Sequence, residues 1–198
     1  GVSVTGGMSA DGARFVRTSV IGDRAPESGI VAAVGLYGEA LRVGYASMGG
    51  WDCFGPERLI TRSMGNRLYE LDGVSALALY KKYLGSHAAE LPASGLLFPL
   101  SLRTGGGKPP LVRTILGIDE REQCMIFAGD MPEGCFARLM KANFDRLIDG
   151  AVGAAKAVGT AQVTEDPDFA LLISCVGRKI VLKQRIEEET EGVREVLG

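Results

Sequence analysis

The chain has 198 residues and a net charge of −2, from 22 Lys and Arg against 24 Asp and Glu. This length suits one sizeable core or two small lobes and excludes a disulfide-stapled mini-protein. The sequence has no block rich in Lys or Arg and only short apolar runs, so neither nucleic-acid binding nor membrane insertion is expected.

The first seventy residues predict a β-rich lobe. Apolar and polar residues alternate over 15–20 and 41–45, which is typical of half-buried strands. The segments 57–63 and 67–71 flank Met64-Gly65-Asn66, a short glycine-containing turn that predicts a hairpin.

The middle of the chain predicts one helix followed by an antiparallel sheet. Asp72 is a candidate N-cap for a helix over 74–84, and Gly85 is a candidate left-handed stop. Short turns separate the predicted strands, which favours antiparallel pairing. The strands are expected at 96–102, 111–118, 124–128 and 135–140.

A second long helix is predicted from residue 143 or 144 to 158, where Gly150 and Gly153 would let it lie close on a sheet. The apolar run 169–175 predicts a strand buried on both faces, and helical sequence follows to Leu197. The fold class expected is α+β, with mixed, largely antiparallel sheets, two main packing helices and a C-terminal helical segment.

The cysteines and the histidine offer no metal site. The four cysteines match no zinc or redox spacing, so we expect reduced thiols, no metal and no cofactor in a cytoplasmic protein. His87 is the sole histidine, and the chain opens on Gly1 instead of methionine, so we expect a piece of a longer protein. The cysteines are Cys53, Cys124, Cys135 and Cys175.

Two glycine-rich stretches are candidates for a phosphate-binding loop. The stretch 105–108 has the Gly-Lys pair of a Walker loop, but Leu102 stands where that loop needs glycine, and two prolines follow. The stretch 7–12 lacks the lysine. We therefore interpret 105–108 as a solvated loop and 7–12 first as a turn.

Arg178 is the most informative charged residue. A cation in the first turn of a helix opposes the helix dipole unless an anion is held there. Arg178 and the N–H groups beside Gly177 could bind a carboxylate or phosphate, and the alternative is an ion pair with an internal Asp or Glu.

Two other residues each allow a functional and a structural interpretation. Cys175 could be an activated nucleophile or a packed thiol, and Trp51 could form the wall of a pocket or cap the core. The acidic run 187–189 is interpreted as a solvated helix face.

Several of these landmarks together resemble the FIST family of sensory domains in bacterial signalling proteins and eukaryotic F-box proteins. The resemblance covers nearly the whole chain in the family's order. The stretches that carry it are Gly6-Gly7-Met8-Ser9-Ala10-Asp11-Gly12, Gly50-Trp51-Asp52-Cys53-Phe54-Gly55-Pro56, Thr61-Arg62-Ser63-Met64-Gly65-Asn66, Phe98-Pro99-Leu100, Pro132-Glu133-Gly134 and Ser174-Cys175-Val176-Gly177-Arg178.

The resemblance implies two parts and a function. Residues 1–70 resemble the end of the family's N-terminal part (FIST N), and 71–198 resemble most of its C-terminal part (FIST C), so the chain is expected to be truncated at both ends. The family implies a non-enzymatic module that binds a small ligand, such as an amino acid or an anion, and relays occupancy to an attached signalling output domain. The predicted ligand-binding residues are Arg178, Gly177, Cys175, Trp51, Gly6, Gly7, Ser9 and Asn66.

Two other functions stay open. A structural or dimerisation module would show an extensive apolar interface and no ligand, and a homodimer is compatible with either this or the sensory function. An enzyme would use Cys175 with a base that the sequence does not identify.

Overall fold

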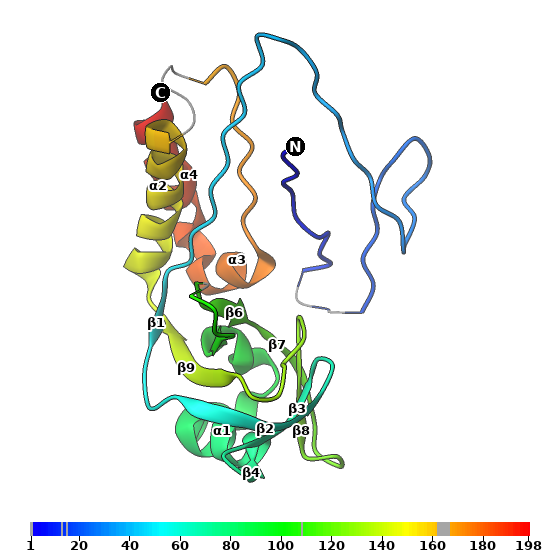
Figure 1. Cartoon of the computed structure of the whole chain (residues 1–198), viewed down its shortest axis with the longest axis vertical. Helices are drawn as coiled ribbons and strands as arrows, with labels where there is room; N and C mark the ends of the chain where they lie inside the picture. Colours follow the sequence, from blue (N-terminus) through cyan, green and yellow to red (C-terminus); the bar gives the residue numbers. More distant parts are fainter. Residues whose placement is uncertain (1, 13, 15, 108, 162–166) are drawn as a thin grey trace. The chain divides into compact units, whose positions relative to one another are not determined.

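The computed structural model describes residues 2–12, 14, 16–107, 109–161 and 167–198 (Figure 1). By their contacts the described residues form two units, 51–143 and the combination of 1–50 with 144–198. The lobe boundary expected near residue 70 rests on the sequence pattern and on the family resemblance, and it stays a prediction.

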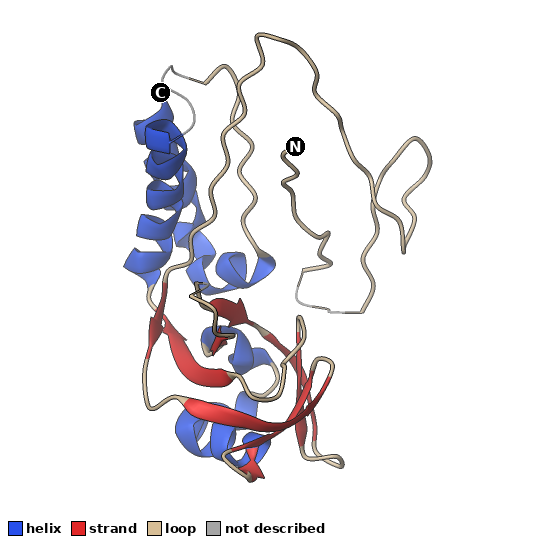
Figure 2. Ribbon diagram, viewed as in Figure 1, coloured by secondary structure: helices blue, strands red, loops and turns tan. Residues whose placement is uncertain are grey.

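Unit 51–143 is built on one antiparallel sheet (Figure 2). The main path runs β6-β5-β9-β2-β3-β8-β7, with β1 added to β9 and β4 added to β3. The strands are β1 (Trp51–Cys53), β2 (Arg58–Met64), β3 (Arg67–Leu71), β4 (Val74–Ser75), β5 (Leu100–Arg103), β6 (Leu111–Arg113), β7 (Ile115–Asp119), β8 (Cys124–Phe127) and β9 (Phe136–Ala142).

The predicted hairpin is confirmed, and two other strand predictions are corrected. In the hairpin, Met64 of β2 pairs with Arg67 of β3 around Gly65, which takes φ 56°. The expected strand 111–118 is two strands, because the chain leaves β5 and joins β8 at Thr114. The expected strand 96–102 begins only after Pro99, since 93–97 form a 3₁₀ turn.

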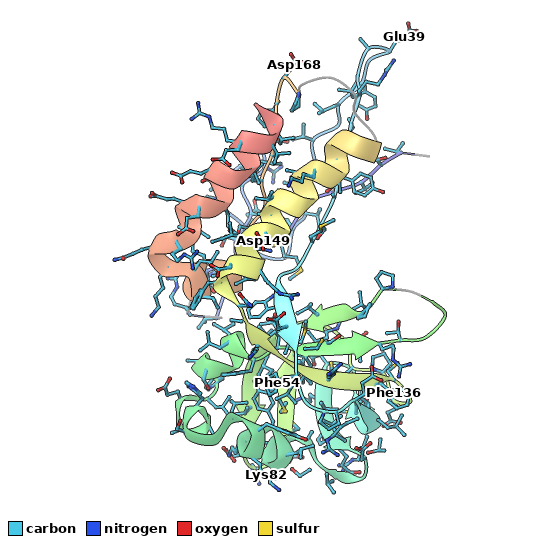
Figure 3. All side chains as sticks on the ribbon, turned by 90° about the vertical axis from the view of Figure 1, so that its left-hand side faces the viewer. Glu39, Phe54, Lys82, Phe136, Asp149 and Asp168 are labelled. Carbon is cyan, nitrogen blue, oxygen red and sulfur yellow. The ribbon has the colours of Figure 1, made fainter. Side chains whose placement is uncertain are left out.

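Helix α1 (Ala76–Leu84) covers the core of this unit. The predicted cap was wrong: the Ser75 hydroxyl accepts from the Ala78 N–H at 3.2 Å, whereas Asp72 lies in a turn at φ 51°. Gly85 ends the helix at φ 57°, as predicted. Figure 3 shows Lys82 on the outer face of the helix. The buried core contacts of α1 come from Ala76, Leu77, Tyr80 and Leu84.

The other unit holds α2 (Phe144–Ala161), α3 (Val176–Leu182), a 3₁₀ turn (Lys183–Arg185) and α4 (Ile186–Leu197). α2 and α4 pack side by side, and a Cβ added at Gly192 would lie 2.7 Å from the Val152 side chain (Figure 1). The predicted close approach at Gly150 and Gly153 is real, but their neighbours are residues of the extended chain at 48–49 and not a sheet.

Three predicted strands of this unit are wrong among the described residues. The chain at 16–20, 41–45 and 169–175 is extended or irregular, and Val20 and Glu27 form an isolated bridge. Phe169 is 78% exposed, so the run 169–175 is not buried on either face. The physical reason is that no described strand pairs with these segments. Phe15, Lys108 and Asp166 lie outside the described residues.

Candidate functional site

The turn from Cys175 to Arg178 begins helix α3. Cys175 has an extended backbone, and its Sγ accepts the Arg178 N–H at 3.3 Å, so the thiol caps the helix. The Cys175 carbonyl accepts the Lys179 N–H at 3.2 Å. Gly177 is buried while Cys175 is exposed, and a Cβ added at Gly177 would meet only the Cys175 Sγ, at 3.7 Å.

The Arg178 guanidinium binds three other segments of its unit. Its Nε donates to Oε1 of Glu189 on α4 at 2.6 Å, and Nη1 donates to the Met48 carbonyl at 3.2 Å. Nη2 donates to the Leu147 carbonyl of α2 and lies 2.5 Å from Glu189 Oε1. The internal ion pair, given above as the alternative for Arg178, is therefore present.

This ion pair is buried. The Arg178 side chain is 12% exposed and that of Glu189 is 5% exposed. The other carboxylate oxygen of Glu189 accepts the Ser174 hydroxyl at 2.9 Å. Removing two charges from water is costly unless each is paired and hydrogen-bonded, and here both conditions are met.

The glycine-rich stretch near the start of the chain approaches this turn through Gly7. A Cβ added at Gly7 would lie 2.8 Å from Cγ2 of Ile173, which precedes Cys175 by two positions. Gly6 takes φ 157° with open space around it, and Ser9 is exposed. The structure thus brings Gly7 to the segment that leads into the Cys175–Arg178 turn.

Trp51 and Asn66 belong to unit 51–143. Trp51 is half-buried in β1 and pairs with Ala142 of β9. The Asn66 side-chain amide donates to the Phe127 carbonyl at 2.8 Å, and the Asn66 carbonyl accepts the Phe127 N–H at 2.9 Å. Asn66 therefore ties the hairpin turn to the end of β8.

A shallow hollow of about 120 Å³ lies in unit 51–143. Its lining includes none of the predicted ligand-binding residues. Within it the Arg62 guanidinium lies 4.6 Å from the centre of the Tyr69 ring and 3.2 Å from a Glu70 carboxylate oxygen. The residues that line it are Arg62, Tyr69, Glu70, Ser75, Glu122 and Gln123.

Sequence reasoning missed Glu189. It stands in the run 187–189, which was interpreted as a solvated helix face. The available signal is helical spacing, since Glu189 and the buried Val193 are four positions apart and share one face of α4. An acidic residue in line with a buried position indicates an internal cation as its partner.

Among the described residues, no three His, Cys, Asp or Glu side chains cluster as metal ligands would. In the same part of the chain, no helix combines the length and the apolar character that crossing a bilayer requires. The four cysteines are free thiols, of which Cys53 and Cys175 are exposed.

Sequence comparison identifies the family. A model of the FIST N domain matches residues 1–74, and a model of the FIST C domain matches residues 76–198. No curated protein and no solved structure was found to match the chain. FIST domains are regarded as sensory domains of signal-transduction proteins and are not an enzyme family. With both domain models matched over nearly its whole length, the chain belongs to the FIST family.

Proposed function

We propose that this chain is a small-ligand-binding sensory module whose ligand is an amino acid or a small anion that binds at Arg178. The observation that carries the proposal is the buried contact between Arg178 and Glu189, in a chain matched throughout by sensory-domain models. A buried guanidinium with a carboxylate partner is chemically suited to receive a ligand carboxylate in exchange.

The ligand would compete with Glu189. A ligand carboxylate on the Arg178 fork displaces the Glu189 carboxylate, which then needs a new partner because it is buried. An amino acid supplies that partner through its ammonium group, whereas a simple anion does not. The zwitterion is therefore the better fit to the pair.

Exchange at this pair would alter how the helices are held. Arg178 joins α3 to α4 through Glu189 and to α2 through the Leu147 carbonyl. A ligand that replaces Glu189 releases α4 from α3, and a signal follows only if the ligand prefers that state. Shifting the population from 1:99 to 99:1 takes about 5.5 kcal/mol of preference.

The other predicted residues take secondary roles in the proposal. Backbone N–H groups at Gly6, Gly7 and Gly177 would complete the anion contacts, with Ser9 and Cys175 beside them. Trp51 and Asn66, which belong to unit 51–143, stay predicted ligand-binding residues. The module would act in the cytoplasm, attached to an output domain and without a cofactor.

A binding screen with matched arginine variants tests the proposal. The probes are the standard amino acids and small carboxylates, measured by thermal shift and then by calorimetry. Arg178→Lys keeps the charge but loses the fork, and Arg185→Lys is the control because Arg185 also pairs with carboxylates in the same unit. We expect a hit that binds the control normally and Arg178→Lys at least roughly tenfold more weakly. A screen without hits, or equal binding by both variants, contradicts the proposal.

The exposed thiols allow a test of the enzyme alternative. Cys175 caps α3, whereas Cys53 lies in β1, and both are exposed. An activated Cys175 thiolate would react with iodoacetamide far faster than Cys53 at neutral pH. We expect comparable rates, which removes this alternative. A large excess of reactivity at Cys175 would favour it.

A further inference from the structure

The hollow in unit 51–143 lies where the pairing of strand β3 is interrupted. On one side β3 changes its neighbour, since residues 67 and 68 pair with β8 whereas residues 70 and 71 pair with β4. On the other side its register with β2 shifts between Arg62 and Ser63. Tyr69 therefore has no register partner in any of these three strands. A bulge of this kind bends the strand and redirects its side chains.

The bulge brings two successive side chains of β3 to Arg62. Successive strand residues normally point to opposite faces of a sheet, yet Tyr69 and Glu70 both contact this guanidinium. Its central carbon lies 4.6 Å from the centre of the Tyr69 ring, and its Nη1 lies 3.2 Å from Glu70 Oε1. The positive charge of the hollow is thus already paired with a carboxylate and stacked on a ring.

The turn between β7 and β8 supplies the opposite part of the lining. Gln123 takes φ 51°, which is uncommon for a residue with a side chain, and it lines the hollow together with Glu122. The Gln123 Nε2 donates to the Glu120 carbonyl at 2.6 Å, which leaves the side-chain oxygen of Gln123 as an acceptor. Within the described parts of the chain, the Glu122 carboxylate pairs with no cation.

These groups favour a cation as the occupant. The lining carries one guanidinium (+1) and two carboxylates (−2), a net charge of −1 at pH 7. Its unengaged acceptors are both oxygens of Glu122, the second oxygen of Glu70 and the side-chain oxygen of Gln123. An ammonium group has three N–H donors and no acceptor, so it matches them. An anion would instead face two carboxylates and an arginine that is already paired.

The volume limits the size of the occupant. At about 30 Å³ for each water molecule of the liquid, the hollow of about 120 Å³ has room for about four non-hydrogen atoms. That is an ammonium group with a short alkyl chain. A larger ligand would extend out of the hollow into solvent.

We propose that this hollow is a second ligand site, which binds a small primary amine as its ammonium ion between Glu122, Glu70 and Gln123. The site does not depend on the ligand proposed for Arg178, because Arg178 belongs to the other unit. A chain that fails to bind amino acids at Arg178 would still be expected to bind the amine here.

An NMR titration of the full chain tests the proposal. Propylamine is the probe, because it is a cation at pH 7 and has the size that the hollow admits, and propionate is an anion of similar size. The ligands are added to millimolar concentration, since so small a molecule reaches only weak affinity. Glu122→Gln removes the unpaired charge at an exposed position, so the fold should be unchanged. Glu90→Gln is the matched control, because Glu90 is exposed in the same unit and does not line the hollow.

We expect propylamine to shift the amide signals of Tyr69 and Gln123 saturably, with similar Kd values for the original chain and for Glu90→Gln. The Kd for Glu122→Gln should be at least roughly fivefold larger, while its signals far from the hollow stay in place and show that it is folded. Propionate should give no saturable shift at these signals. Three results would each overturn the proposal: no saturable shift with propylamine, equal Kd values for the two variants, or propionate binding as tightly as propylamine.

Discussion

Arg178 on α3 donates to Glu189 on α4 across 2.6 Å; the Glu189 side chain is buried and that of Arg178 is only 12% exposed. The Leu147 and Met48 carbonyls share the same guanidinium, so one side chain holds α2, α3, α4 and the chain before β1. A buried charge that loses its partner is strongly destabilising, whereas removing both charges together costs much less.

Arg178→Met is expected to lower the free energy of unfolding by about 3–5 kcal/mol, because it leaves Glu189 buried and unpaired. The double variant Arg178→Met with Glu189→Leu should recover part of that loss. Urea unfolding of both single variants and the double variant completes a double-mutant cycle. Losses that simply add would mean that the two side chains are not coupled.

Local patterns in the sequence predicted most of the elements. The predictions failed where an element depends on pairing with a part of the chain that is distant in sequence. The β2–β3 hairpin and helix α2 follow from a turn and from helical spacing, which neighbouring residues specify. The run 169–175 has a strand's composition, but a strand needs a hydrogen-bonding neighbour that composition does not specify. Glu189 was misassigned although its spacing from Val193 places it on the buried face of α4, because the spacing alone does not identify Arg178 as its partner.

Ser75, and not Asp72, should control the start of α1. Its hydroxyl accepts the Ala78 N–H, so Ser75→Ala is expected to cost about 0.5–2 kcal/mol of unfolding free energy. Ser75→Asp keeps a capping oxygen and should cost less. Thermal unfolding followed by circular dichroism compares the two variants. A Ser75→Ala protein as stable as the original would show that the cap contributes nothing.

Asp72 should contribute to stability in a pH-dependent way. The Leu59 N–H, which donates at 2.8 Å, and then Arg58 hold the pKa of Asp72 below its usual value of 3.8. The contribution is therefore present above about pH 4, where the unfolded carboxyl is ionised, and is lost as pH falls through the lower folded pKa.

Asp72→Asn isolates that contribution. Asparagine tolerates the φ of 51° at this position, so the backbone is not strained by the change. We expect the variant to be less stable than the original at pH 6 and the difference to shrink by pH 2. Urea midpoints across this range measure it, and a difference that is constant with pH would rule out the carboxylate as its source.

Gly50 should tolerate no side chain. A Cβ added there would lie 2.0 Å from the Arg146 carbonyl oxygen and 2.5 Å from the Leu147 Cα, and backbone atoms of a helix cannot easily move away. Gly50→Ala is expected to destabilise the unit by about 1–3 kcal/mol or more. Gly22→Ala is the matched control, because a Cβ at Gly22 has no atom within 4 Å. Equal unfolding midpoints for the two variants would contradict the close approach of Gly50 to α2.

Tyr80 couples the core of unit 51–143 to alkaline pH. Its hydroxyl donates to the Phe98 carbonyl at 2.7 Å, and burial raises the pKa of Tyr80 well above its usual value of 10.0. Above pH 10 the unfolded chain loses this proton while the folded chain keeps it, so stability falls as pH rises.

The variant Tyr80→Phe tests this coupling. It removes the titrating group but leaves the Phe98 carbonyl without its donor, which costs about 1–3 kcal/mol of unfolding free energy at neutral pH. Urea unfolding at pH 7 and near pH 11 should therefore show that Tyr80→Phe is less stable than the original chain, by a difference in unfolding free energy that becomes smaller as pH rises. Tyr37→Phe is the control, because Tyr37 is exposed, and its stability relative to the original chain should not change in this way between the two pH values. If Tyr80→Phe is less stable by the same amount at both pH values, Tyr80 ionises as readily in the folded chain as in the unfolded one.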